Sequence, residues 1–494
     1  MQILEKMASC DSQGSVYIGE NTVFRPVADA HAASVREVLT LVETGIDGVV
    51  ETKVCVEADL PAELKGQGAL TLQHRKIDFV SYSHEWCATM LQDAAAFHLT
   101  LSEQLLAKGL ALKDAHPWNI LFDRGHPIFV DFTSIVTEQG LFAEEYLEAN
   151  QQFSDSSNNL RQAILVREIF ARMFQPYFLN PLILYACGKR DQVRSRIENT
   201  TLNTATDTIR IRECFSFRLL SRSLIKNIVR LFIYRKRESR AYSKLRDKSN
   251  LSAFYADMCS HVQGLPVEIG ASDYSSYYKN KGEDQDWCFS ENWNDKQKSV
   301  HHALNSSDIT SVLDVACNTG WYALMAEKLG KRVVAFDIDE SCIETLYRQV
   351  KHSRLNILPL VMNFTQLTRD RYSIHDGNKV LVNASKRLRS DAVIVLGLIH
   401  HLTLGLGMHF KDVLDSLIDL CRKRLVIEFV DPQDAMIQNE PSFFPAYFKN
   451  HEIMNKYDMQ TMISEIERRG FTVQVLPSYP DTRKVLICDR DRQT

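Results

Sequence analysis

From residue 311 onward, short apolar runs alternate with helical segments, and this alternation constrains the fold more than any other feature of the sequence. Strands that alternate with helices typically form a parallel sheet covered by helices on both faces. The five apolar runs are Ser311 to Val315, Val333 to Asp337, Ile357 to Met362, Ala392 to Gly397 and Leu425 to Phe429. A helix from Met459 to Arg469 follows, and then the runs Phe471 to Leu476 and Lys484 to Cys488 predict an antiparallel hairpin. We therefore expect an α/β domain with a Rossmann-like, mostly parallel sheet of seven strands.

A tight turn of small residues follows the first of these strands. Residues 311–322 read Ser-Val-Leu-Asp-Val-Ala-Cys-Asn-Thr-Gly-Trp-Tyr, so the strand that carries Asp314 leads into small residues and a helix start at Trp321. Such a turn lets a ligand lie against the backbone at the carboxyl edge of the sheet. Asp337 ends the second strand, twenty-three residues after Asp314. An acid at that position can accept hydrogen bonds from both hydroxyls of an adenosine ribose.

These residues resemble motif I and the acidic motif II of class I methyltransferases that use S-adenosylmethionine (SAM). Here Ala-Cys-Asn-Thr-Gly stands in place of the commoner glycine-rich turn. The resemblance implies that Asp314 and the backbone of residues 316–320 hold the methionine part of SAM. It also implies that Asp337 holds the ribose and that Asn363, just past the third strand, lies near the adenine. The SAM-binding residues expected on this basis are Asp314, Ala316, Cys317, Asn318, Gly320, Asp337 and Asn363.

Two other interpretations of this α/β pattern compete with the methyltransferase. A dinucleotide-binding Rossmann domain calls for Gly-x-Gly-x-x-Gly after its first strand, and only Gly320 is present here. An α/β domain whose cleft binds nothing is the second alternative.

Polar residues follow the fourth and fifth strands, where an acceptor for the methyl group is expected to lie. His400 and His401 come just beyond the fourth strand, and an imidazole there can remove a proton from the acceptor. The alternative for either histidine is that it only shapes the pocket wall. Glu428 lies on the fifth strand with Asp431 and Asp434 close behind, and such carboxylates can bind sugar hydroxyls or a cationic amine. We therefore name His400, His401 and Glu428 as candidate catalytic residues.

Aromatic residues are frequent just upstream of motif I. In similar enzymes this segment folds over the donor as a lid, and aromatic rings suit that role because they stack and exclude water. Ordinary packing against the sheet is the alternative. The residues concerned are Tyr274, Tyr277, Tyr278, Trp287 and Trp293.

A strand-loop-strand unit in the N-terminal half concentrates polar residues at a second place. Asp114 is followed five residues later by Asn119 and twelve residues after that by Asp131. This spacing, preceded by a helical stretch from Glu85 to Leu106, resembles the catalytic loop and metal-binding Asp of the protein kinase and aminoglycoside phosphotransferase fold. The resemblance covers residues 14–210 and implies an α+β domain with Asp114 as base, Asn119 and Asp131 as magnesium ligands, and Mg-ATP as a second cofactor.

The N-terminal segment also departs from that pattern. Leu112 and Lys113 stand where His and Arg or Gly are usual, Thr133 replaces the usual Gly, and no glycine-rich phosphate loop is visible. Lys53 is one candidate for the phosphate-pairing lysine, and Arg25 is a candidate replacement. Active phosphotransfer, ligand binding without transfer, and a structural or substrate-presenting role therefore all stay open, as does a turn in which the Asp and Asn only satisfy backbone groups.

Length and composition add bounds on the organisation of the chain. Because 494 residues exceed what one core usually supports, we expect two domains. The resemblances imply a kinase-like domain at residues 1–215 and a methyltransferase domain at 266–494, with a basic helical linker at 216–265 between them. Lys and Arg interleave with apolar residues from 218 to 248, a pattern that suits contact with an anionic surface or a solvated linker. The 11 scattered cysteines favour a reducing cytoplasm, and no apolar run reaches the ~20 residues of a membrane helix.

The order of the two segments resembles a family of bacterial two-domain methyltransferases, some of whose members are associated with nodulation factors or surface polysaccharides. The sequence thus predicts a SAM-dependent methyltransferase that acts on an oxygen or nitrogen of a small molecule or glycan. A bifunctional methyltransferase and kinase, and a SAM-binding scaffold, are the alternatives. The sequence leaves the acceptor and the oligomeric state open.

Overall fold

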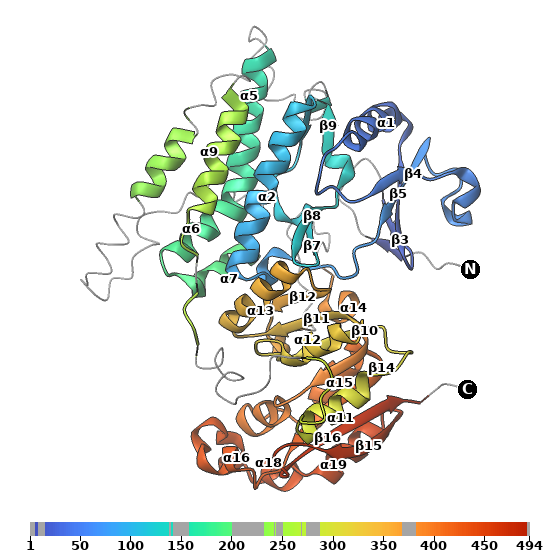
Figure 1. Cartoon of the computed structure of the whole chain (residues 1–494), viewed down its shortest axis with the longest axis vertical. Helices are drawn as coiled ribbons and strands as arrows, with labels where there is room; N and C mark the ends of the chain where they lie inside the picture. Colours follow the sequence, from blue (N-terminus) through green and yellow to red (C-terminus); the bar gives the residue numbers. More distant parts are fainter. Residues whose placement is uncertain are drawn as a thin grey trace. The chain divides into compact units, whose positions relative to one another are not determined.

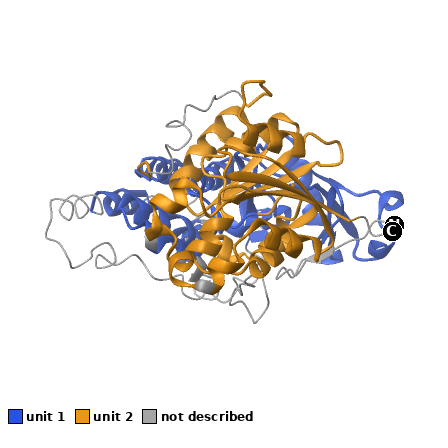
Figure 2. Cartoon of the chain, turned by 90° about the horizontal axis from the view of Figure 1, so that it is seen from below, with its two compact units in different colours: residues 1–77, 81–268, 372–380 blue, residues 78–80, 269–371, 381–494 orange. Residues whose placement is uncertain are grey.

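The computed structural model of the chain describes residues 5–7, 15–137, 140–141, 158–199, 232–241, 243, 250–267, 269–272, 287–367 and 382–491. The chain divides into two compact units, which Figure 2 colours separately. Unit 1 comprises residues 1–77, 81–268 and 372–380, and unit 2 comprises residues 78–80, 269–371 and 381–494. Among the helices of these described ranges, none combines the length and apolarity that crossing a bilayer requires.

Unit 1 is built on a five-stranded antiparallel sheet and two small hairpin-like sheets. The strand order in the large sheet is β1-β2-β3-β5-β4, and β6 pairs with β9 while β7 pairs with β8. The strands are β1 (Glu5–Met7), β2 (Val16–Ile18), β3 (Thr22–Val27), β4 (Thr52–Val54), β5 (Leu70–Arg75), β6 (Leu110–Leu112), β7 (Ile120–Asp123), β8 (His126–Phe129) and β9 (Ile135–Thr137). Short 3-10 turns η4 (Pro117–Asn119) and η5 (Phe132–Ser134) connect the small sheets.

Helices α9 and α6 and the π-helix η6 of unit 1 pack against α2, which buries apolar side chains at helical spacing. The predicted helix from Glu85 is confirmed, although it begins three residues later. Its Gln92 donates from Nε2 to the carbonyl oxygens of Val262 and Leu265, both at 2.9 Å, so α9 belongs to unit 1 although it falls in the segment expected as a linker. The helices are α1 (Asp29–Glu43), α2 (Ala88–Ala107), α5 (Asn158–Ile169), the π-helix η6 (Phe170–Leu179), α6 (Asn180–Ala186), α7 (Arg190–Asn199) and α9 (Leu251–Gln263) (Figure 1).

Unit 2 contains a seven-stranded sheet in the order β12-β11-β10-β13-β14-β16-β15. The first five strands of this order pair in parallel, and β16 pairs antiparallel with both β14 and β15, so the expected C-terminal hairpin is present. Every residue of β10, β12 and β13 is buried, which is why these strands read as continuous apolar runs. The strands are β10 (Ser311–Val315), β11 (Arg332–Asp337), β12 (Ile357–Val361), β13 (Ser390–Val395), β14 (Cys421–Val430), β15 (Phe471–Pro477) and β16 (Arg483–Arg490).

The strand order of unit 2 reverses between β10 and β13. Chain progression runs from β10 toward β12 on one side and from β13 toward β14 on the other, and ligands of such sheets bind at this switch point, beyond the carboxyl ends of the strands. The helices of unit 2 are α11 (Asp295–Leu304), α12 (Trp321–Lys328), α13 (Glu340–Ser353), α14 (Ala384–Arg387), α15 (Phe410–Leu420), α16 (Ala435–Asn439), α17 (Pro445–Lys449), α18 (His451–Lys456) and α19 (Met459–Glu467). Short turns are η11 (Phe364–Gln366), the π-helix η12 (His401–Gly405) and η13 (Pro441–Phe443).

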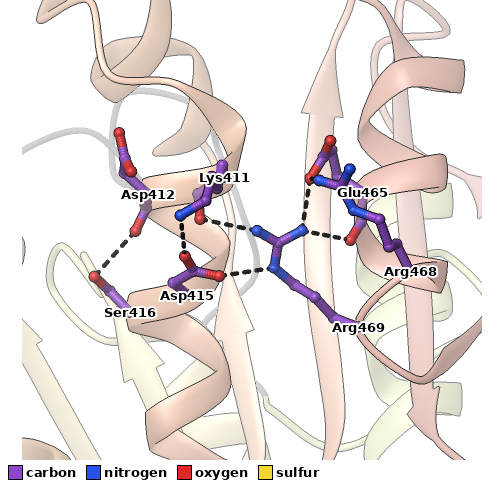
Figure 3. Close-up of polar contacts among 7 residues, drawn as sticks. All are labelled: Lys411, Asp412, Asp415, Ser416, Glu465, Arg468 and Arg469. Carbon is purple, nitrogen blue, oxygen red and sulfur yellow. Dashed lines mark hydrogen bonds and ion pairs between the residues drawn. The ribbon is translucent and has the colours of Figure 1, made fainter.

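A polar cluster ties α15 to the end of α19, as Figure 3 shows. Arg469 donates from Nε to Asp415 Oδ1 at 2.8 Å and from Nη1 to Glu465 Oε2 at 2.6 Å. Lys411 also pairs with Asp415 at 3.0 Å. Because α15 and α19 pack side by side, this cluster fixes their relative position next to the strands that carry the site.

Candidate active site

The turn between β10 and α12 has the backbone that a ligand-binding turn needs. Ala316 and Asn318 both have left-handed φ values, 58° and 54°, which non-glycine residues adopt only where the surrounding structure imposes them. Gly320 has a φ of 83°, and a Cβ there would lie 2.7 Å from the side chain of Leu346. Only glycine therefore fits at this position, where α13 packs directly against the turn.

Asp337 at the end of β11 holds this turn in place. Its Oδ2 accepts the backbone N–H of Asn318 at 2.8 Å, and its Oδ1 accepts the N–H of Asp339 at 2.9 Å. The N–H of Cys317 donates to the carbonyl of Phe336 at 3.0 Å. Burial raises the pKa of Asp337, and the two backbone donors partly oppose that shift.

Asp314 on β10 is a buried acid, and one of its carboxylate oxygens has no hydrogen-bond partner among the described residues. It is 3% exposed, and its Oδ2 accepts no hydrogen bond within the described part of the chain. Burial, and then the nearby negative charge of Asp337, raise its pKa to about 8. An acid in this state gains most from pairing with a cationic group.

Cys317 and Asn363 are two further side chains of the predicted SAM site. Cys317 is buried in the turn, and burial raises the pKa of its thiol well above the usual range, so it stays protonated. Asn363 follows β12 and its Oδ1 caps η11 by accepting from Thr365 N at 3.0 Å. Its contact with adenine stays a prediction.

His400 and His401 begin the π-helix that follows β13. Their rings lie 4.3 Å apart between centroids, and Phe444 packs against both at 5.7 and 5.3 Å. His400 is 1% exposed and neither ring nitrogen finds a partner within the described residues, whereas His401 is half-buried. Burial lowers the pKa of both imidazoles. The neighbouring His401 lowers the pKa of His400 further, and Arg483 does the same for His401. Both rings are therefore neutral near pH 7 and able to accept a proton.

Glu428 on β14 is fully buried and already engaged by two residues that the sequence analysis did not single out. Lys296 on α11 pairs with its Oε2 at 2.9 Å, and Ser478 donates to its Oε1 at 2.9 Å. The Lys296 ammonium also lies 5.6 Å from the ring centroid of Tyr322. Asn294 and Gln297 form a capping box that marks the start of α11 in sequence, but no local pattern reveals that Lys296 reaches a strand 132 residues away.

Asp434 has a structural contact that its sequence position did not suggest. Arg483 of β16 pairs with it through two donors, at 2.8 and 3.1 Å, and Thr482 donates to it at 2.7 Å. Its Oδ1 also caps α16 by accepting from Met436 N at 3.0 Å. This buried pair anchors the segment that carries Phe444 to the histidines.

The aromatic approach to motif I is described only in part. Tyr274, Tyr277 and Tyr278 lie outside the described residues, so the lid stays a prediction. Trp293 is buried and packs edge-on against Trp321 at 5.3 Å, which is the ordinary packing that the alternative foresaw.

The predicted catalytic loop of unit 1 gathers its three polar residues around one hydroxyl. Ser134 Oγ lies 2.7 Å from both Asp114 Oδ2 and Asp131 Oδ2, and Asn119 Nδ2 donates to it at 3.3 Å. Arg25 of β3 pairs with Asp131. Burial alone would raise the pKa of Asp131, but the Arg25 charge and three hydrogen bonds outweigh it and hold the pKa at about 2.

The basic segment expected at residues 218–248 is described only at 232–241 and 243, where it is helical up to residue 241. Phe232 and Ile233 are exposed there beside Arg235, Lys236 and Arg240. The contact with an anionic surface stays a prediction.

Comparison with known proteins bears on unit 2 first. Residues 259–476 match the family model described as "Methyltransferase domain", which spans β10 and the other parallel strands and extends into β15. Unit 2 contains a methyltransferase domain. This match makes the chain a SAM-dependent methyltransferase.

Relatives of the methyltransferase extend the likeness over most of the chain. The chain is 22% identical to the nodulation protein NoeA of Rhizobium meliloti (strain 1021) over 472 residues. This alignment covers 90% of this chain and 92% of NoeA. Among solved structures it is similar to an O-methyltransferase family protein from Burkholderia thailandensis, at 15% identity and a TM-score of 0.28, over 40% of this chain and 57% of that one. It is also similar to the bifunctional kinase-methyltransferase WbdD, at 14% identity and a TM-score of 0.28, over 47% of this chain and 45% of WbdD. The chain thus spans about half the length of these two solved proteins.

Proposed function

We propose that the methyltransferase moves a methyl group from SAM to an oxygen or nitrogen atom of a small molecule or glycan. The observation that carries this proposal is that a turn with left-handed residues, the buried Asp314, the half-buried Asp337 and a neutral histidine pair all lie on or just after parallel strands of one sheet, around its switch point.

The polar groups around the β10–α12 turn suit the charged and hydroxyl groups of SAM. In this proposal the unpartnered Oδ2 of Asp314 takes the ammonium of the methionine part, and Asp337 accepts the ribose hydroxyls with the lone pairs that its backbone contacts leave open. In this proposal the backbone of residues 316–320 lies along the methionine part, and Asn363 lies toward the adenine.

The protein's own contribution to the reaction is orientation and proton removal. SAM supplies an electrophilic methyl group on a sulfonium, and holding the acceptor in line with it accounts for much of the expected acceleration. We assign His401 as the proton acceptor because it is half-buried, neutral and follows β13 at the switch point of the sheet, whereas His400 is buried. Glu428 with Lys296 positions the polar groups of the acceptor.

Replacing His401 by phenylalanine is expected to lower kcat about 100-fold or more, because general-base catalysis typically contributes that much. The dissociation constant of SAM should stay unchanged, since the ring lies outside the predicted donor contacts. The matched variant is His400→Phe, which keeps a ring in the buried wall and should change kcat far less. A reversed order of the two effects would refute this assignment of the base.

The acceptor class is testable with labelled methyl groups. Cell extracts supplied with methyl-labelled SAM and the purified wild-type protein should yield a labelled small molecule or glycan, and extracts supplied with Asp314→Ala should not. Accumulation of S-adenosylhomocysteine in the same reactions provides a second readout. Binding of SAM by calorimetry without any such product would instead favour the SAM-binding scaffold.

The proposed location is the cytoplasm. The 11 cysteines of the chain are scattered singly along the sequence, which suits a reducing compartment. Fractionation of the native cells, with the protein detected by antibody, tests this placement, and recovery with an extracellular fraction would contradict it.

A further inference from the structure

The three polar residues of the predicted catalytic loop in unit 1 each lie at or just after the end of a short element. Asp114 follows β6, Asn119 ends η4 just before β7, and Asp131 follows β8. If this unit worked as the resemblance implies, Asn119 and Asp131 would bind magnesium through side-chain oxygens. Whether the residues present fit that ion can be judged from what each oxygen already contacts.

Both carboxylate oxygens of Asp131 are engaged by the protein itself. Arg25 Nη1 donates to Oδ1 and also to the hydroxyl of Thr133, and Thr133 in turn donates to Oδ1 at 3.0 Å. Ser134 Oγ lies 2.7 Å from Oδ2. The Arg25 side chain is only 9% exposed, so its contact with Asp131 is a buried one and not a surface ion pair.

The second acid and the amide are drawn into the same network. Asp114 Oδ2 lies 2.7 Å from Ser134 Oγ, and the Asn119 amide nitrogen donates to that oxygen at 3.3 Å. A hydroxyl has a single proton, so Ser134 donates to one carboxylate at a time and the Arg25 charge is what keeps the group together. Thr133, the residue that departs from the glycine of the kinase pattern, supplies one of the Arg25 contacts.

This donor set does not fit magnesium. The ion requires near-octahedral oxygen ligands with several waters, whereas here a buried guanidinium already contacts the central carboxylate. Among the described residues, no group of three or more His, Cys, Asp or Glu side chains could hold a metal ion. An arginine is always charged and cannot leave the site by losing a proton.

We propose that Arg25 is a built-in cation that takes the place of the metal in unit 1, so that Asp131, paired with Arg25 and joined to Asp114 through Ser134, belongs to a closed polar network that binds no divalent cation. It follows that unit 1 does not transfer phosphate by the magnesium-dependent route. The inference is independent of the proposed methyltransferase activity, because it rests only on residues of unit 1.

The first test uses the wild-type chain and Mn²⁺, a paramagnetic substitute for magnesium. Titration followed by electron paramagnetic resonance, with and without ATP, should show no Mn²⁺ site that Asp131→Asn removes. One Mn²⁺ per chain, bound by the wild type and lost in Asp131→Asn, would overturn the proposal. SAM affinity of each protein, measured alongside, shows that unit 2 is folded.

The second test measures the coupling between the two charges. Arg25→Met should lower the melting temperature by roughly 5 °C or more, because it leaves Asp131 buried without its counter-ion, and adding Asp131→Asn should restore much of that loss. The control is Arg75→Met, which removes the exposed pair of Arg75 with Asp123, 2.7 Å apart, and should change the melting temperature little. If Arg25→Met behaves like Arg75→Met, or if the double variant shows no recovery, the network does not depend on Arg25 and the proposal fails.

Discussion

Asp314→Asn is expected to weaken SAM binding about 100-fold or more, because losing one partner of a buried charge pair typically costs about 2–5 kcal/mol. The variant keeps the size of the side chain but removes the charge that the ammonium of SAM requires. Calorimetric titration with SAM measures the effect. A matched control is Asp391→Asn. Asp391 is another buried acid, but it lies at the start of β13, away from the carboxyl ends of the strands, and it accepts from Thr310 N at 2.9 Å. Equal affinity of Asp314→Asn and wild type for SAM would contradict the proposed donor site.

The raised pKa of Asp314 adds a pH signature to this result. With a pKa of about 8 in the free protein, the carboxyl is mostly protonated at pH 7 and must lose its proton to pair with the ammonium. SAM binding should therefore release close to one proton at pH 7, and affinity should rise with pH up to about 8, where an α-amino group begins to lose its own proton. Titration in two buffers of different ionisation enthalpy counts the proton. Asp314→Asn should release none.

The same shift affects the stability of the free protein. A carboxyl whose pKa is raised by folding stabilises the folded state below its unfolded pKa of about 4, and that contribution is lost as pH rises through about 8. Denaturation midpoints of the free wild-type protein should thus fall over this range more steeply than those of Asp314→Asn.

Asp434→Ala is expected to destabilise unit 2 by about 3–5 kcal/mol, since it leaves Arg483 buried without its partner. The change also removes the cap of α16 and the contact with Thr482. Because this segment carries Phe444 onto both histidines, the KM for the acceptor should rise while SAM affinity stays the same. Denaturant unfolding of the full chain and steady-state kinetics measure the two effects.

An exposed ion pair in the same segment provides the control for Asp434. Lys456 and Glu452 pair across one turn of α18, and Lys456→Met should leave the unfolding midpoint unchanged. If Asp434→Ala were no more damaging than this control, the pair with Arg483 would not be the anchor. The pKa of Asp434, held at about 2 against the effect of burial by Arg483 and Thr482, places the loss of this contribution between pH 4 and pH 2, as pH falls.

Local patterns predicted the parallel strands of unit 2 well, because most of their residues form buried apolar runs and Asp337 ends its strand. The strand that carries Asp314 was predicted with its observed bounds, and the helix start at Trp321 is confirmed. The partners of the candidate residues were not predictable in this way. Lys296 reaches Glu428, and Arg483 reaches Asp434, only because the order of strands and helices brings distant segments together.

Unit 1 shows the same limit at its polar network. Spacing alone marked Asp114, Asn119 and Asp131 as a group, and the structure gathers them around Ser134. Arg25 was considered only as a substitute for a phosphate-binding lysine, whereas it contacts Asp131 106 residues away in sequence. A motif fixes which oxygens are near one another, but a cation from another strand decides what they can bind.

The position of β16 has a consequence for how the methyltransferase domain is assembled during synthesis. β14 ends at residue 430, yet its neighbour on one side begins at residue 483, so the ribosome must add a further stretch of chain before that edge can be covered. Until then the apolar residues 425–427 and 429–430 belong to an open strand that another polypeptide can join. Fraying of the hairpin in a finished molecule would expose the same strand, so aggregation during expression is the characteristic hazard of this topology.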